Sequence, residues 1–140
     1  MKNRIIIVMA LTFMLSACNN SGDVNKSDPL ESGRGFIEAS LKGDYVKAEE
    51  YILPDSTNME YLHILRDFNS KRTPEERENY RDANIIIDST QTLSDSVTII
   101  TYSNTYKKVP QKLKMIKHNN DWLVDFKFTL NENPSLLSPQ

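Results

Sequence analysis

Hydrophobic residues in the first half of the chain recur every three or four positions, which is the spacing of amphipathic helices. The first helix is predicted to start at Pro29, because Asp28 before it is an efficient cap and proline suits the first helical position. It is predicted to end at Gly43, since glycine accepts the left-handed conformation that closes many helices. Three more helices are predicted at residues 44–53, 57–68 and 73–81.

The predicted helix at residues 57–68 begins with a capping-box pattern from Thr57 to Glu60 and has one apolar stripe. The stripe consists of Tyr61, Ile64, Leu65 and Phe68. His63 and Asp67 fall on the opposite side of the same helix, so both side chains are expected to face water.

The second half of the chain changes to the alternating pattern of β-strands. Strands are predicted at residues 83–93, 97–106, 112–117 and 122–128. In the last strand, the inward face is predicted to hold Trp122, Val124, Phe126 and Phe128. Helices followed by an antiparallel meander predict one α+β domain, with N-terminal helices packed on a sheet of about four strands. The predicted core comprises Phe36, Ile37, Leu41, Leu65, Phe68, Trp122, Val124 and Phe126.

The N-terminal segment has the layout of a secretory signal: Lys2 and Arg4, then an apolar run from Ile5 to Leu15, then small residues. The apolar run is shorter than the roughly 20 residues that span a bilayer. The sequence Leu15-Ser16-Ala17-Cys18 resembles the lipobox of bacterial lipoproteins, which implies that the Cys18 thiol is lipidated and that the mature chain begins there. The alternatives are an uncleaved membrane anchor and a plain secretory cut that leaves a free thiol.

This interpretation divides the chain into a signal peptide at 1–17, a tether at 18–27, a folded domain at 28–130 and a loose tail at 131–140. A lipid anchor makes the membrane the first predicted partner and the bacterial cell envelope the predicted location. Asn19 stands where aspartate would resemble an inner-membrane retention signal, which favours the outer membrane in a bacterium with two membranes.

Charge argues against one class of partner. Without Lys2 and Arg4, the mature chain has 15 basic and 19 acidic residues, a net charge of −4. Nucleic-acid binding usually needs a basic surplus on one face, so no nucleic-acid partner is expected. Two short basic stretches, at 106–108 and 111–114, are interpreted as solvated faces of strands.

Two stretches of the chain resemble a known group of proteins. Phe36 to Ala48 follows the pattern F-x-x-A-x-x-x-G-D-Y-x-x-A, and Asn120 to Asp125 resembles a closing turn and strand. Both are similar to small bacterial lipoproteins of unassigned function with a cone-shaped, cystatin-like domain of the nuclear transport factor 2 type. The resemblance implies a curved sheet wrapped round a long first helix, with a pocket between them and no particular ligand.

Catalytic members of that superfamily use a pocket Asp, Glu or His with a tyrosine or a second acid. Besides His63 and Asp67, the candidates here are Asp88, expected at a turn or bulge, and Asp125, expected to point away from Trp122. Tyr102 and Tyr106 share a predicted strand face and are the candidate ligand-binding residues, although paired tyrosines on a strand also serve as packing. The two histidines are far apart and Cys18 stands alone, so neither a metal nor another cofactor is predicted.

The sequence therefore favours a membrane-tethered, non-catalytic module that binds a small apolar ligand or an envelope protein. Two alternatives stay open: an isomerase or dehydratase that uses a pocket acid, and a structural domain that forms a homodimer through its sheet. A buried, paired Asp or His in the pocket would favour the enzyme. A pocket of Tyr, Ile and Phe would favour binding.

Overall fold

The computed structural model describes residues 25–137 of the 140-residue chain. The predicted signal peptide and Cys18 lie outside the described residues. None of the helices in the described part is long and apolar enough to cross a membrane.

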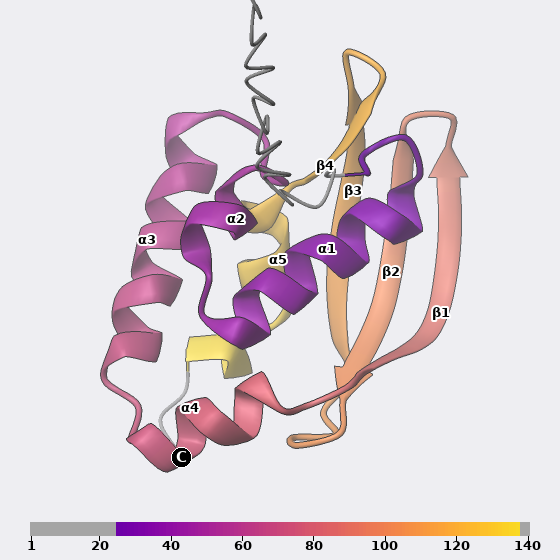
Figure 1. Ribbon diagram of the computed structural model, residues 1–140. Coiled ribbons are helices and arrows are strands. Elements are labelled where there is room, and N and C mark those ends of the chain that lie inside the picture. The colour runs from indigo at the N-terminus through magenta and orange to yellow at the C-terminus, as the bar shows by residue number, and fades with distance from the viewer. Residues whose placement is uncertain (1–24, 138–140) are drawn as a thin grey trace, which may run out of the picture.

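Four helices make up the first half of the domain (Figure 1). They are α1 (Pro29–Lys42), α2 (Tyr45–Glu49), α3 (Ser56–Ser70) and α4 (Pro74–Arg81). The predicted caps of α1 are confirmed: the Asp28 carboxylate accepts the amides of Leu30 and Glu31, and Gly43 closes the helix with φ of 73°. At α4, Thr73 and Glu76 form a reciprocal capping box.

Helix α3 starts earlier than predicted, and its buried side is shifted from the predicted stripe, of which Leu65 alone is fully buried. Its cap is Asp55, whose carboxylate accepts the amide of Asn58, so the predicted capping box from Thr57 is wrong. Leu62 is 2% exposed, whereas Ile64 of the predicted stripe is 40% exposed. Helix α3 packs against α5 (Phe126–Glu132) and α2, and these contacts determine which side of the helix is buried.

The sheet is antiparallel, with strand order β1-β2-β3-β4. Its strands are β1 (Ile85–Ser94), β2 (Val97–Asn104), β3 (Gln111–His118) and β4 (Asp121–Val124). Helix α1 crosses one face of this sheet, and α5 lies between α3 and the sheet (Figure 1). The fold is therefore the predicted α+β domain, with N-terminal helices on a four-stranded antiparallel sheet.

The predicted strand at 122–128 is wrong in its second half. Strand β4 ends at Val124, and α5 begins at Phe126. Alternation of Phe126 and Phe128 suits a strand, but as a helix the segment buries Phe126, Thr129 and Leu130 on one side. Phe128 consequently does not share a strand face with Trp122.

The packed part of the chain extends beyond the predicted domain limits at both ends. The Lys26 carbonyl, within the predicted tether, accepts the Trp122 amide at 2.8 Å. In the predicted loose tail, the Asn133 side chain bonds both the amide and the carbonyl of Lys112, at 2.8 and 2.7 Å. A short 3-10 helix at Pro134–Leu137 follows.

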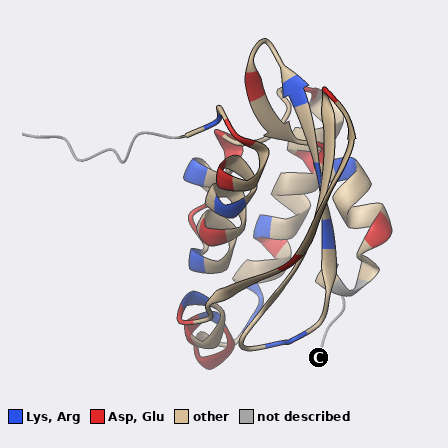
Figure 2. Ribbon diagram, turned by 90° about the vertical axis from the view of Figure 1, so that its right-hand side faces the viewer, with Lys and Arg blue, Asp and Glu red and all other residues tan. Residues whose placement is uncertain are grey.

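The core lies between α1, α5 and the sheet. Of the predicted core residues, six are buried and pack in one cluster: Phe36, Ile37, Leu65, Trp122, Val124 and Phe126. Leu41 is half-buried and packs against this cluster, whereas Phe68 is half-buried outside it. Acidic and basic residues are interspersed over the helices and the sheet rather than gathered by sign (Figure 2).

Candidate functional site

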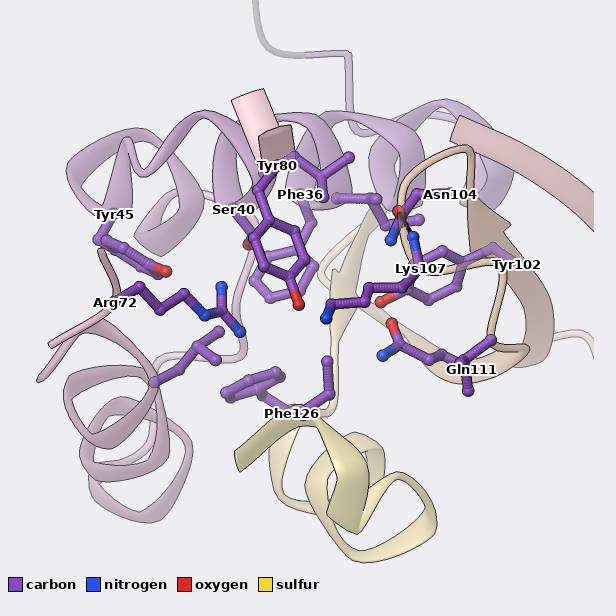
Figure 3. Close-up of a pocket in the computed structure, with 15 residues that line it drawn as sticks. Phe36, Ser40, Tyr45, Arg72, Tyr80, Tyr102, Asn104, Lys107, Gln111 and Phe126 are labelled. Carbon is purple, nitrogen blue, oxygen red and sulfur yellow. Dashed lines mark hydrogen bonds between the residues drawn. The ribbon is translucent and has the colours of Figure 1, made fainter. Parts of the chain in front are cut away.

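A cavity of about 90 Å³ opens between α1, the turn from α3 to α4, the far end of β2 and the start of α5. A single water needs roughly 10–15 Å³ on this measure, so the cavity has room for a small ligand. Figure 3 shows its side chains converging from opposite sides. They are Phe36, Ile37, Ser40, Leu41, Tyr45, Leu65, Arg72, Tyr80, Tyr102, Asn104, Lys107, Val109, Gln111, Phe126 and Leu136.

The inner wall of the cavity is apolar and continuous with the core. Phe36 of α1 and Phe126 of α5 pack ring against ring, with centroids 5.4 Å apart and a tilt of 59°. Burial of both rings gives the cavity a rigid aromatic base, because neither ring can move without opening the core.

The two predicted ligand-binding tyrosines have different positions. Tyr102 lies on β2, is 6% exposed and lines the cavity, and burial raises the pKa of its hydroxyl. Tyr106 lies beyond the end of β2, so the two do not share a strand face, and it is not part of the cavity lining. Its ring packs edge-on against Tyr80, with centroids 5.0 Å apart, so Tyr106 supports the rim from outside.

Arg72 enters the cavity from the turn between α3 and α4. Its guanidinium carbon lies 3.9 Å from the Tyr80 ring centroid and 5.2 Å from that of Phe68, so the two rings hold the group by cation–π contacts. One guanidinium nitrogen, Nη1, donates to Asn69 Oδ1 at 2.9 Å. These contacts fix the orientation of the group and leave other N–H donors on its edge.

Lys107 reaches the cavity from the turn after β2. The Asn104 side chain shapes that turn by accepting the amides of Tyr106 and Lys107, at 3.0 and 2.9 Å. The ammonium nitrogen of Lys107 lies 4.8 Å from the Tyr106 ring centroid and 6.0 Å from that of Tyr80. The interpretation of residues 106–108 as a solvated strand face is therefore wrong for Lys107, which is half-buried and points inward (Figure 3).

Neutral polar groups complete the lining. The Ser40 hydroxyl oxygen is buried, and it has no hydrogen-bond partner among the described residues. The Gln111 amide turns toward the cavity from the start of β3 (Figure 3). Burial raises the pKa of Tyr45 to about 12 despite the nearby positive charge of Arg72, so this phenol is neutral at physiological pH.

No acid and no histidine is among the lining residues in the described part of the chain. His63 and Asp67 are exposed on α3, on its outer side as expected. Asp88 is also exposed, and it falls where the pairing of β1 with β2 shifts between Ile87 and Ser89, which confirms the expected bulge. None of these candidates lies at the cavity.

Asp125 is the one buried acid of the described chain. It caps the start of α5 away from the cavity lining, and its carboxylate oxygens lie 3.4 Å from the ammonium groups of Lys114 and Lys127. Oδ1 makes no hydrogen bond with good geometry, so its contact with Lys127 is an ion pair only. We interpret Asp125 as a structural ion-pair centre that joins β3 to α5.

Within residues 25–137, no group of three or more His, Cys, Asp or Glu side chains is placed to hold a metal ion. Comparison of the chain with protein-family models, with curated proteins and with solved structures gave no match.

Proposed function

We propose that this protein is a non-catalytic binding module whose cavity takes a small, largely apolar ligand. The observation that carries the proposal is the cavity lining: an apolar, aromatic base with a few convergent polar groups, and no acid or histidine among the described lining residues. Small-molecule sites commonly combine an apolar wall with a few polar groups that fix orientation. General acid–base catalysis would instead need a titratable side chain within hydrogen-bond reach of the ligand.

We also propose that the module is tethered to a membrane. The lipobox ending in Cys18 supports a lipid anchor in the bacterial envelope, with the outer membrane favoured where there are two. The resemblance to small lipoproteins with a cone-shaped domain supports the same proposal. An anchored module of this kind would hold its ligand close to the membrane surface.

Native mass spectrometry of the gently purified full chain tests the binding function. We expect added mass from a bound small molecule. Ser40→Leu is the matching loss-of-binding variant, because the larger side chain enters the cavity and no hydrogen bond of the Ser40 hydroxyl is lost. The added mass should disappear in this variant.

Ser56→Leu is the control for that variant, because Ser56 is exposed at the start of α3, away from the cavity lining. Both variants should keep the unfolding midpoint of the parent chain. The proposal is wrong if the parent chain carries no added mass, or if Ser40→Leu carries the same added mass as the parent.

A further inference from the structure

We propose that the ligand of this cavity carries one carboxylate on a small apolar body, and that Arg72 and Lys107 hold this carboxylate. The inference rests on the proposed binding function and adds to it the chemical class of the ligand. Three observations support it: the contacts that hold the Arg72 guanidinium at the cavity, the convergence of a second cation, and the lack of an acid that forms an ion pair with either cation in residues 25–137.

The Arg72 guanidinium lines the cavity and is held there by three neighbours. Its carbon lies over the rings of Tyr80 and Phe68, and one N–H donates to Asn69 Oδ1. The remaining N–H groups lie in the plane of the guanidinium, in the arrangement that matches the two oxygens of a carboxylate. A stacked guanidinium is already ordered, so little side-chain entropy is lost when it binds.

Lys107 brings a second positive charge to the same place. Both cations lie within 6.0 Å of the Tyr80 ring centroid, and Figure 3 shows them pointing toward one another across that ring. Like charges brought together in a half-buried site repel, and an anion between them removes the repulsion.

No acid of the described chain makes an ion pair with either cation, at a limit of 4.0 Å between nitrogen and oxygen. Glu76 is close enough that its pKa is lowered first by the hydrogen bonds from Thr73 and then by the charges of Arg72 and Lys107. Its carboxylate, however, accepts the Thr73 amide at 2.9 Å in the capping box of α4. Within residues 25–137, the two cations therefore face the cavity with no acid in direct ion-pair contact, and Glu76 offsets part of their charge from its place in the α4 cap.

The rest of the cavity limits what the carboxylate is attached to. The Phe36 and Phe126 rings also line the cavity, and they suit an apolar or aromatic group. The Ser40 hydroxyl offers one more hydrogen bond near α1. A small aromatic or short aliphatic acid fits this combination of a charged rim and an apolar base.

The experiment compares benzoate with benzamide, which has the same shape and no charge, on the full chain by isothermal titration calorimetry. We expect benzoate to bind about 10–100-fold more tightly than benzamide, the usual range for a charge-assisted hydrogen-bonded pair. Arg72→Leu should remove this preference, so that benzoate and benzamide bind within about threefold of one another. Lys107→Met should reduce the preference, because its apolar stem is kept while the charge is lost.

Two exposed cations supply the controls. Arg66→Leu changes an arginine on the outer side of α3, and Lys108→Met changes the lysine next to Lys107 in the chain. Neither residue lines the cavity, so both variants should keep the full preference for benzoate. Loss of the preference in either control would show a general effect of net charge and would overturn the assignment.

The outcomes separate this inference from the function on which it rests. Equal binding of benzoate and benzamide would agree with the proposed binding function but would overturn the assignment of a carboxylate to the ligand. Tighter binding of phenyl phosphate than of benzoate would also overturn it, in favour of a phosphate ester. Failure of every probe to bind at about 10 mM would overturn both the binding function and its ligand class.

Discussion

Replacing Asn58 with leucine tests how α5, and with it the base of the cavity, is held in place. Asn58 is fully buried on α3, and its Oδ1 accepts the amide of Lys127 in the first turn of α5 at 2.7 Å. Its Nδ2 donates to Asp55 Oδ2 at 2.6 Å. Leucine has nearly the same shape as asparagine, so the change removes these hydrogen bonds without opening a large cavity.

The expected loss of unfolding free energy follows from the two hydrogen bonds of the Asn58 side chain. Leaving the Lys127 amide without an acceptor costs about 1–3 kcal/mol of unfolding free energy. The Asp55 carboxylate is about half exposed and can turn to water, so its lost bond contributes little. We therefore expect Asn58→Leu to destabilise the domain by about 2 kcal/mol, which lowers the unfolding temperature by roughly 8 °C for a domain of this size.

Urea unfolding followed by the fluorescence of Trp122 measures the free energy, since Trp122 is the one tryptophan of the chain and is buried. Hydrogen exchange of the Lys127 amide gives a local reading and should speed up in the variant. Asn79→Leu on the exposed side of α4 is the control, because Asn79 makes no side-chain hydrogen bond in the described structure. A loss within about 0.5 kcal/mol of this control would refute the role of Asn58.

Two further predictions concern charge and location. Asn58→Asp keeps an acceptor for Lys127 but sets a second carboxylate against Asp55. In the parent chain the pKa of Asp55 is lowered, first by the hydrogen bond from the Asn58 amide, so Asp55 adds stability above its unfolded pKa of about 3.9 and loses it as pH falls. In the variant, repulsion between the two facing carboxylates raises the pKa of the pair, so the folded domain loses stability as pH rises. Urea unfolding should show the largest loss of unfolding free energy relative to the parent chain, about 1–3 kcal/mol, above about pH 6. A deficit that does not change between pH 4 and pH 7 would contradict this. Cys18→Ser should move the protein from the membrane fraction to the soluble fraction on cell fractionation, and retention on the membrane would contradict the lipid anchor.

The parts of the fold that local sequence predicted correctly are those that local hydrogen bonds determine. The Asp28 cap, the Gly43 end and the capping box of Thr73 and Glu76 each join residues within four positions of one another, so the sequence contains the whole interaction. The start of α5 differs, because the acceptor for the Lys127 amide comes from Asn58, 69 positions away. The alternation of aromatic residues from Trp122 onward gave no sign of that bond.

Of the cavity residues, Tyr102 could be predicted from the sequence, because strand alternation and its position near the end of β2 indicate where it lies. Arg72 and Lys107 come from two turns and meet only through the ring of Tyr80, so no spacing in the sequence joins them. The available signal was weak: a basic residue just before the α4 cap, and a basic pair after a strand.

Two charged clusters of this domain show why the cavity differs from its surroundings. In the first cluster, the buried Asp125 carboxylate forms ion pairs with Lys114 and Lys127, which balance its negative charge. Around Tyr80, Arg72 and Lys107 converge without an ion-paired acid in the described chain. Charges without an ion-paired acid and an unpaired hydroxyl such as that of Ser40 cost folding stability, and proteins tend to retain such groups where function needs them. An anionic ligand would complete the second cluster in the way that Asp125 completes the first.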